Sequence, residues 1–308
     1  MRRAALLLAT AALVSCGGSD AGPKLTKVAS FPGSLVEADG HQVYFDCEGS
    51  GSPTVVFLSG LGSESADWLQ VFDHVKQRTR TCEYDRGDVG VTAAYGLALP
   101  RKARDARDQV HELELLIDNA DIPEPLVLVG HSWGGALAWL YAGTHDDVEA
   151  VVFVDASVPG QDAAIQAALP PRRRGESADL TQLRQPAPAD PVLSPEYLDW
   201  RKSLQEVATV EDLGDLPVVV LTAGKHFGAA DRYLLPVWLR LQDRIARLST
   251  RSVHVLAPTS GHFVQLDEPG LTTAAVDAAV EAARDDGELA SCAAIFAHVR
   301  GGHCVGGG

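Results

Sequence analysis

A serine between two glycines is the residue pattern in this chain that is best suited to chemistry. Ser132 lies in the sequence Gly-His-Ser-Trp-Gly at residues 130–134, directly after the apolar run 126–129 and before a stretch rich in alanine and leucine. A sharp turn from a buried strand into a helix exposes the serine hydroxyl at the tip of a sheet, and small residues are needed on both sides of it. We therefore predict that Ser132 is a nucleophile. The alternative is a serine that only caps the helix.

Two further groups are needed before a serine hydroxyl can act as a nucleophile. It needs a base, because a hydroxyl is a poor nucleophile at its free pKa. The best candidate is His262, which follows the apolar segment 254–257 on a loop that contains glycine. It also needs donors for a developing oxyanion, and the backbone N–H of Trp133 lies at the start of the predicted helix.

The elements that must position these residues alternate between strand and helix. Several strand-like runs are continuously apolar, which is typical of a parallel sheet covered on both faces. Strands are predicted at 34–39, 41–47, 54–59, 79–85, 126–131, 148–155, 217–223 and 251–257. Helices are predicted near 66–78, 102–119, 133–144, 232–248 and 270–284. The proline-rich stretch 159–215 interrupts the alternation and is too long for a simple connection, so we predict a cap or lid.

Together these features resemble the α/β-hydrolases over residues 36–284. The resemblance rests on the serine turn, on Tyr-Asp-Arg-Gly at 84–87 and on Ser-Gly-His at 260–262. It implies an α/β fold with a mostly parallel, eight-stranded central sheet, flanking helices and a lid after the sixth strand. The expected organisation is a signal peptide (1–15), a tether (16–33), a hydrolase core (34–158 and 216–286), a lid (159–215) and a C-terminal tail (287–308).

The acid that would orient His262 has two candidates. The resemblance places it after the seventh strand, where the first carboxylate is Asp231. Some members of the family carry it after the sixth strand instead, and here that strand leads directly into Asp155. Asp155 would emerge at the same sheet edge as Ser132, so we prefer it and keep Asp231 as the alternative acid. The role would be to hold the histidine tautomer and stabilise the imidazolium.

The resemblance also implies a second oxyanion donor on the loop after the third strand. That loop is Ser-Gly-Leu-Gly at residues 59–62, and the donor would be the backbone N–H of Leu61. Related proteins commonly carry His-Gly at the start of this loop, so Ser59 is a departure. A backbone donor does not depend on that side chain.

The N-terminus predicts a lipoprotein signal. Two arginines precede an eleven-residue apolar run, which is too short to span a bilayer, and Leu-Val-Ser-Cys at 13–16 resembles a bacterial lipobox. Cleavage before Cys16 and lipidation of its sulfur would anchor the mature protein outside the cytoplasm. An ordinary secretory signal is the alternative, and the protein would then be secreted.

Four cysteines remain after Cys16, an even number that suits an oxidising compartment. We predict the disulfides Cys47–Cys82 and Cys292–Cys304. The strand order of the resembled family would bring the first pair together. A metal cluster of Cys292, His298, His303 and Cys304 is the alternative, although its spacing matches no common zinc pattern.

Charge and motifs limit the partners. The formal net charge is −15, which disfavours binding to nucleic acid. The sequence shows no metal or nucleotide motif, since the glycine-containing run 60–65 lacks the last glycine of a dinucleotide fingerprint. We therefore expect no cofactor and no metal. The expected partners are a small acyl substrate and, through Cys16, a membrane. The sequence leaves the oligomeric state open.

The nucleophile sets the reaction class. Epoxide hydrolases and dehalogenases share this turn but carry aspartate at the position of Ser132. A serine predicts an acyl-enzyme, and so hydrolysis of a carboxylic ester, thioester or lactone. A peptidase or amidase and a cofactor-free haloperoxidase would use the same triad, and both remain open. The last alternative is a binding protein that keeps the fold and turns over slowly.

Overall fold

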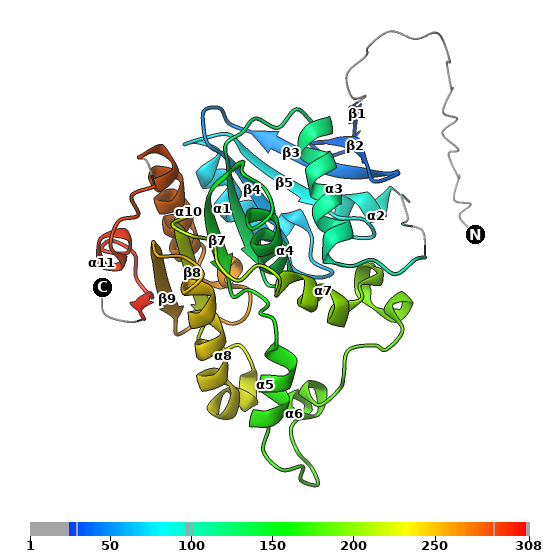
Figure 1. Cartoon of the computed structure of the whole chain (residues 1–308), viewed down its shortest axis with the longest axis vertical. Coiled ribbons are helices and arrows are strands. Elements are labelled where there is room, and N and C mark those ends of the chain that lie inside the picture. Colours follow the sequence, from blue (N-terminus) through cyan, green and yellow to red (C-terminus); the bar gives the residue numbers. More distant parts are fainter. Residues whose placement is uncertain (1–24, 29, 96–98, 100, 286, 306–308) are drawn as a thin grey trace, which may run out of the picture.

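The central element of the structure is one ten-stranded sheet with helices on both faces (Figure 1). The computed structural model describes residues 25–28, 30–95, 99, 101–285 and 287–305. The strand order is β1-β2-β3-β5-β4-β6-β7-β8-β9-β10, with parallel pairing from β5 through β9. The strands are Thr26–Lys27 (β1), Ser34–Ala38 (β2), His41–Glu48 (β3), Thr54–Leu58 (β4), Thr81–Asp85 (β5), Leu126–His131 (β6), Val148–Val154 (β7), Val218–Ala223 (β8), Ser252–Ala257 (β9) and His303–Cys304 (β10).

This is the predicted α/β architecture, with two additions. All eight predicted strands are present, and the sheet gains β1 and β10 at its edges. Each of these has two residues, which is too short for an alternating or apolar pattern to stand out in a sequence.

The helices form layers on the two faces of the sheet. Side chains alternate along a strand, so Val55 and Phe57 of β4 join the cluster under α1 and α10, while Val56 and Leu58 join the cluster under α3, α4 and α8. The α-helices are Leu69–Val75 (α1), Gly90–Ala94 (α2), Ala106–Asn119 (α3), Trp133–Ala142 (α4), Gln161–Ala168 (α5), Ala178–Leu183 (α6), Trp200–Val207 (α7), Asp231–Ala246 (α8), Val264–Asp267 (α9), Pro269–Arg284 (α10) and Cys292–Ile295 (α11).

Helix α3 begins later than its predicted start at residue 102. Asp105 accepts a hydrogen bond from the backbone of Asp108, and the Asp108 side chain accepts one from the backbone of Asp105. This reciprocal capping box satisfies N–H groups at the helix end and fixes the first residue as Ala106. The start of α3 matters for the site, because Gln109 lies in its first turns.

The segment between β7 and β8 includes residues 159–215, for which the sequence predicts a cap or lid. It contains α5, α6, α7 and the short 3₁₀ helices Pro191–Leu193 (η2) and Pro195–Tyr197 (η3). Figure 1 shows α5 and α6 at one end of the molecule, away from the sheet. Helix α7 packs on α3 and α4, which brings the last part of the insertion back to the core.

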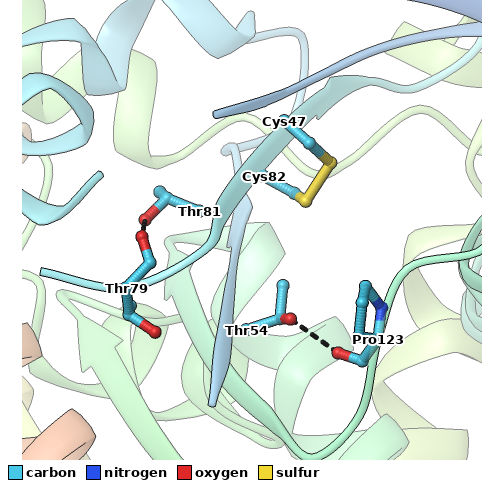
Figure 2. The surroundings of a disulfide bond; sticks show 6 residues. All are labelled: Cys47, Thr54, Thr79, Thr81, Cys82 and Pro123. Carbon is cyan, nitrogen blue, oxygen red and sulfur yellow. Dashed lines mark hydrogen bonds between the residues drawn. A yellow bond between two sulfur atoms is a disulfide. The ribbon is translucent and has the colours of Figure 1, made fainter. Parts of the chain in front are cut away.

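Two disulfides join the predicted pairs of cysteines. Strand β3 pairs antiparallel with β5, so Cys47 lies opposite Cys82, and their sulfurs are bonded (Figure 2). Cys292 at the start of α11 is bonded to Cys304 of β10. Two sulfurs bonded to each other cannot serve as thiolate ligands, so this pairing removes the alternative metal cluster with His298 and His303.

No helix in the described ranges is long and apolar enough to cross a membrane. The predicted signal peptide, the lipobox and Cys16 lie outside the described residues, as does most of the tether.

Strand β5 carries a carboxyl group whose ionisation opposes folding at high pH. Glu83 lies opposite Asp46 of β3. Burial, followed by the charges of Asp46 and Asp85, raises the pKa of Glu83 to about 8. The unfolded carboxyl titrates near pH 4.5. The folded protein therefore binds more protons than the unfolded chain between these two values, and it loses stability as the pH rises through this window.

Replacing Glu83 with glutamine should remove this pH dependence. We expect Glu83→Gln to resemble the wild type at pH 5 and to exceed its free energy of unfolding by about 2 kcal/mol at pH 8, a figure reduced for partial exposure. Urea unfolding at pH 5, 7 and 8 measures the difference. Glu149→Gln, at an exposed position of β7, is the matched control. A stability difference that is equal at all three pH values would contradict the expectation.

Candidate active site

Ser132 occupies the strained turn that the sequence predicts. It lies between β6 and α4, with φ 51° and ψ −117°. Residues other than glycine rarely adopt a positive φ, and such strain persists only where the surrounding structure enforces it. The serine side chain makes no capping hydrogen bond to α4, which removes the alternative of a simple helix cap.

The glycines around Ser132 are required by close backbone contacts. A Cβ atom on Gly130 would lie 2.5 Å from the carbonyl oxygen of Gly134. A Cβ atom on Gly134 would lie 2.1 Å from the carbonyl oxygen of Leu58 in β4. Both separations are shorter than van der Waals contact allows, so the turn can pack between strand and helix only with glycine at these positions.

Asp155 follows β7 and is fully buried. Its backbone has φ 44°, a second strained position at the same sheet edge. One carboxylate oxygen, Oδ1, accepts hydrogen bonds from the backbone N–H of Ala223 at 3.0 Å and from the indole N–H of Trp238 at 2.6 Å. These bonds fix the carboxylate and leave its other oxygen for further partners.

Two histidines share that other oxygen. The Nδ1 atom of His262 lies 2.7 Å from Oδ2 of Asp155, and the Nδ1 atom of His226 hydrogen-bonds to the same oxygen. The rings of the two histidines are 4.3 Å apart, centre to centre. With a carboxylate as the acceptor, each Nδ1 atom carries the proton, so Nε2 of a neutral His262 remains available as a base.

The loops that carry these histidines lie side by side. The backbone N–H of Lys225 donates to the carbonyl of Ser260 at 2.9 Å, and that of Gly224 donates to the carbonyl of Ala257 at 2.8 Å. Because β8 and β9 are parallel neighbours, both loops leave the sheet at one edge. This explains why His226 and His262 reach one carboxylate.

The electrostatics at Asp155 favour the anion. Burial alone would raise the pKa of this carboxyl, but the charge and hydrogen bond of His226, together with those of His262, outweigh burial and hold the pKa well below its usual range. Asp155 is therefore ionised at neutral pH and can stabilise a positive charge on a neighbouring imidazole.

His131 lies beneath the site in a neutral form. Its Nε2 atom donates to the backbone carbonyl of His262 at 2.9 Å, and burial together with the nearby His262 charge lowers its pKa to about 3. A neutral imidazole here avoids placing a positive charge next to the base. The bond ties the serine turn to the loop that carries His262.

Asp231 lies at the start of α8 and accepts a hydrogen bond from a neighbouring loop. Its Oδ1 atom accepts from the backbone N–H of Phe227 at 2.6 Å. This hydrogen bond stabilises the loop that carries His226. The structure thus brings Asp155, and not Asp231, into hydrogen-bonding contact with His262.

The predicted oxyanion donors lie on adjacent segments. The N–H of Trp133 is the first of α4, and such groups have no partner within their own helix. Gly60 of the loop at 59–62 packs directly on the serine turn, because a Cβ atom there would lie 3.4 Å from Cβ of Ser132. The loop that contains Leu61 therefore borders the nucleophile.

The same carboxylate and imidazoles could also hold a metal ion. One ligand atom each from Asp155, His226 and His262 lies within 4.8 Å of the others. Nitrogen and oxygen ligands of this kind suit zinc. Both Nδ1 atoms are hydrogen-bonded to Asp155 Oδ2, so an ion held by these three atoms would have to displace the protons on both rings.

Sequence reasoning missed the contact between His226 and Asp155. The signal was present, because His226 follows β8 at the sheet edge where the resembled family places its acid. It also missed the ion pair between Arg86 and Glu196, which are 110 positions apart in the sequence. No local pattern predicts such a pair.

Comparison with known proteins shows where the chain belongs. Residues 55–276 match the model of the Alpha/beta hydrolase family. The chain is also 27% identical over 238 residues to the uncharacterized protein YqjL of Bacillus subtilis (strain 168), which covers 74% of this chain and 84% of that protein.

Solved structures share the fold. A thermophilic esterase from Thermogutta terrifontis aligns with a TM-score of 0.55 and 17% identity, over 87% of this chain and 100% of that one. The haloalkane dehalogenase DatA from Agrobacterium tumefaciens C58 aligns with a TM-score of 0.55 and 19% identity, over 85% and 97%. Because the family match spans well over half of the sequence, this chain belongs to the alpha/beta hydrolase family.

Proposed function

We propose that this protein is a serine hydrolase that cleaves a carboxylic ester, thioester or lactone through an acyl-enzyme. Ser132 is the nucleophile, His262 the base and Asp155 the acid. The observation that carries the proposal is the hydrogen bond from His262 Nδ1 to the buried Asp155, on a loop that is hydrogen-bonded through His131 to the strained turn of Ser132. A binding protein would have no need of this arrangement.

The proposed reaction gives each of these groups one role. His262 Nε2 takes the proton of Ser132 as the serine oxygen bonds to the acyl carbon, and the carbonyl oxygen becomes an oxyanion facing the N–H groups of Leu61 and Trp133. His262 then gives the proton to the leaving alcohol or thiol as its bond to the acyl carbon breaks. Water attacks the acyl-enzyme by the same steps and releases the acid.

The nucleophile favours acyl transfer over dehalogenation. The solved structure of DatA is named as that of a haloalkane dehalogenase. The family resemblance implies an aspartate in such enzymes at the position where this chain has Ser132. The relative from Thermogutta terrifontis is named as an esterase. A serine oxygen suits attack on an acyl carbon, so we place the chain with the esterases.

Hydrolysis of p-nitrophenyl esters of increasing acyl length tests this function. We expect turnover by the purified protein without its first 24 residues, with a preference among chain lengths that reports the size of the acyl site. No release of p-nitrophenol from any ester, together with no reaction with a fluorophosphonate, would contradict the proposal and favour a binding role.

Removing His226 tests whether it supports the acid. A hydrogen bond to a charged group contributes about 1.5–3 kcal/mol, so His226→Ala should lower the free energy of unfolding by an amount in that range. The remaining three donors still hold Asp155, so we expect Ser132 to stay reactive. Urea unfolding measures the loss, with His74→Ala, an exposed histidine paired with Asp277, as the control. An unchanged stability would show that His226 contributes nothing to the carboxylate.

We also propose that the mature protein is anchored outside the cytoplasm through a lipid on Cys16. The lipobox and the two disulfides support this location, since disulfides persist in oxidising compartments. Mass spectrometry of the protein from bacterial membranes should find a lipidated N-terminus at Cys16. Cys16→Ala should release the protein, and an unmodified cysteine would contradict the anchor.

A further inference from the structure

A buried ion pair joins the lid insertion to the core. Arg86 follows β5, and Glu196 lies in η3 of the insertion. Arg86 Nε donates to Glu196 Oε2 at 2.7 Å, and Arg86 Nη2 donates to Oε1 at 2.9 Å. Both side chains are 1% exposed. A bidentate pair this deeply buried has a defined geometry and excludes water.

Both members of the pair form hydrogen bonds with the backbone of the loop at 59–62. Arg86 donates to the backbone carbonyls of Ser59 and Gly60, at 2.7 and 2.6 Å. Glu196 Oε1 accepts the backbone N–H of Gly62 at 2.8 Å. Leu61, the proposed oxyanion donor, lies between these anchored peptide groups.

The same carboxylate is linked to the serine turn. Gln109 of α3 donates its side-chain N–H to Glu196 Oε2 at 3.1 Å. The oxygen of that Gln109 amide accepts the indole N–H of Trp133 at 2.7 Å. Glu196 therefore contacts the segment that carries one oxyanion donor and, through Gln109, the residue that carries the other.

Within the described residues, every hydrogen-bond partner of the Glu196 carboxylate is a donor. The neighbours are Arg86 Nε and Nη2, the N–H of Gly62 and the amide of Gln109, whose oxygen is already used by Trp133. An uncharged amide at position 196 would turn an N–H group toward at least one of them. Glu196 and Tyr197 also have positive φ values, 56° and 55°. Residues other than glycine rarely adopt this backbone conformation unless tertiary contacts hold them in it.

We propose that Glu196, acting through Arg86 and Gly62, is a positioning residue that sets the oxyanion donors. This inference rests on the proposed hydrolase function. Because Glu196 belongs to the lid insertion, the donors are in place only while this part of the insertion is seated on the core. On this proposal, the contact between the lid insertion and the core completes the oxyanion site.

Kinetics of the Glu196→Gln variant test the proposal. Loss of one oxyanion donor costs about 10²–10³-fold in kcat, so displacing one should lower kcat by roughly 10–100-fold. KM should stay within about threefold, since donors that act in the transition state contribute little to ground-state binding. Glu176→Gln is the matched control, because Glu176 is also in the insertion and pairs with Arg184, away from the loop. Wild-type kcat in Glu196→Gln would overturn the proposal.

A double variant separates positioning from stability. Glu196→Gln leaves a buried arginine unpaired, which destabilises the fold, whereas replacing both partners with apolar residues often restores stability. The Arg86→Met/Glu196→Met protein should therefore recover its Tm while kcat stays low. If kcat recovered together with Tm, Glu196 would have a structural role only.

Hydrogen exchange tests the anchoring without any substrate. The Gly62 amide is bonded to Glu196 in the wild type, so the peptide covering 59–64 should exchange at least about tenfold faster in Glu196→Gln. Unchanged protection would overturn the proposal. If the wild type hydrolysed no ester, the proposed function would fail, and the exchange measurement would still decide whether Glu196 holds this loop.

Discussion

Replacing Ser132 with alanine is expected to lower kcat for ester hydrolysis by about 10⁶-fold, the size of the loss when the serine of a triad is removed. The reason is that no other group can form the acyl-enzyme at this position. Assays at saturating p-nitrophenyl ester measure the change, with Tm as a check that the variant folds.

Ser203→Ala is the matched control for this variant. Ser203 is a buried serine of α7, outside the proposed machinery. Its replacement should leave kcat within about twofold of the wild type, since substitutions away from a site change little. Turnover that survives in Ser132→Ala would remove the acyl-enzyme mechanism.

Replacing Asp155 with asparagine is expected to lower kcat by about 10⁴-fold, the loss seen when the acid of a triad is made neutral. All four partners of this carboxylate are donors: two N–H groups on Oδ1 and two imidazoles on Oδ2. An asparagine must turn its own N–H₂ toward one of these pairs. If it faces His262, that ring has to accept through Nδ1, which puts the proton on the nitrogen needed as the base.

Asp231→Asn is the comparison that decides between the two predicted acids. Asp231 accepts a backbone N–H from Phe227, which an asparagine oxygen can also accept. We expect a loss of less than about tenfold, since the bond is retained. A larger loss in Asp231→Asn than in Asp155→Asn would transfer the role of the acid to Asp231.

The fold could be predicted because its signals are local. Continuous apolar runs such as 55–58 and 218–221 indicate buried parallel strands, and the turn at 130–134 marks where the chain enters a helix. Cys47 and Cys82 could be paired once the strand order was assumed, because opposite positions in an antiparallel pair lie within reach of a disulfide. The two-residue strands β1 and β10 carry no such signal.

The choice of acid could not be settled from the sequence. Asp155 and Asp231 both follow strands that end at the site, and a pattern of residues does not say which side chain turns inward. Packing determines which carboxylate contacts the histidine: Trp238 of α8 and the backbone of Ala223 hold the Asp155 side chain, which bonds to His262. The second histidine on this carboxylate depends on the same long-range packing.

The contact between the lid insertion and the loop at 59–62 could not be predicted from the sequence, for a different reason. The prolines of 159–215 indicate an irregular segment, and irregular segments have no period that predicts which residue is buried. An isolated glutamate there is most simply interpreted as exposed. Only the fold shows Glu196 next to Arg86, where charge pairing and four donors stabilise it.

The central claim is that Ser132 is an activated nucleophile, and reaction with a fluorophosphonate followed by peptide mass spectrometry tests it most directly. Attack by an activated serine displaces fluoride and leaves the phosphonyl group on its oxygen. The structure predicts one adduct, on the peptide that contains Ser132, and none in Ser132→Ala. No adduct on the folded protein, or an adduct on another residue that persists in Ser132→Ala, would contradict the assignment.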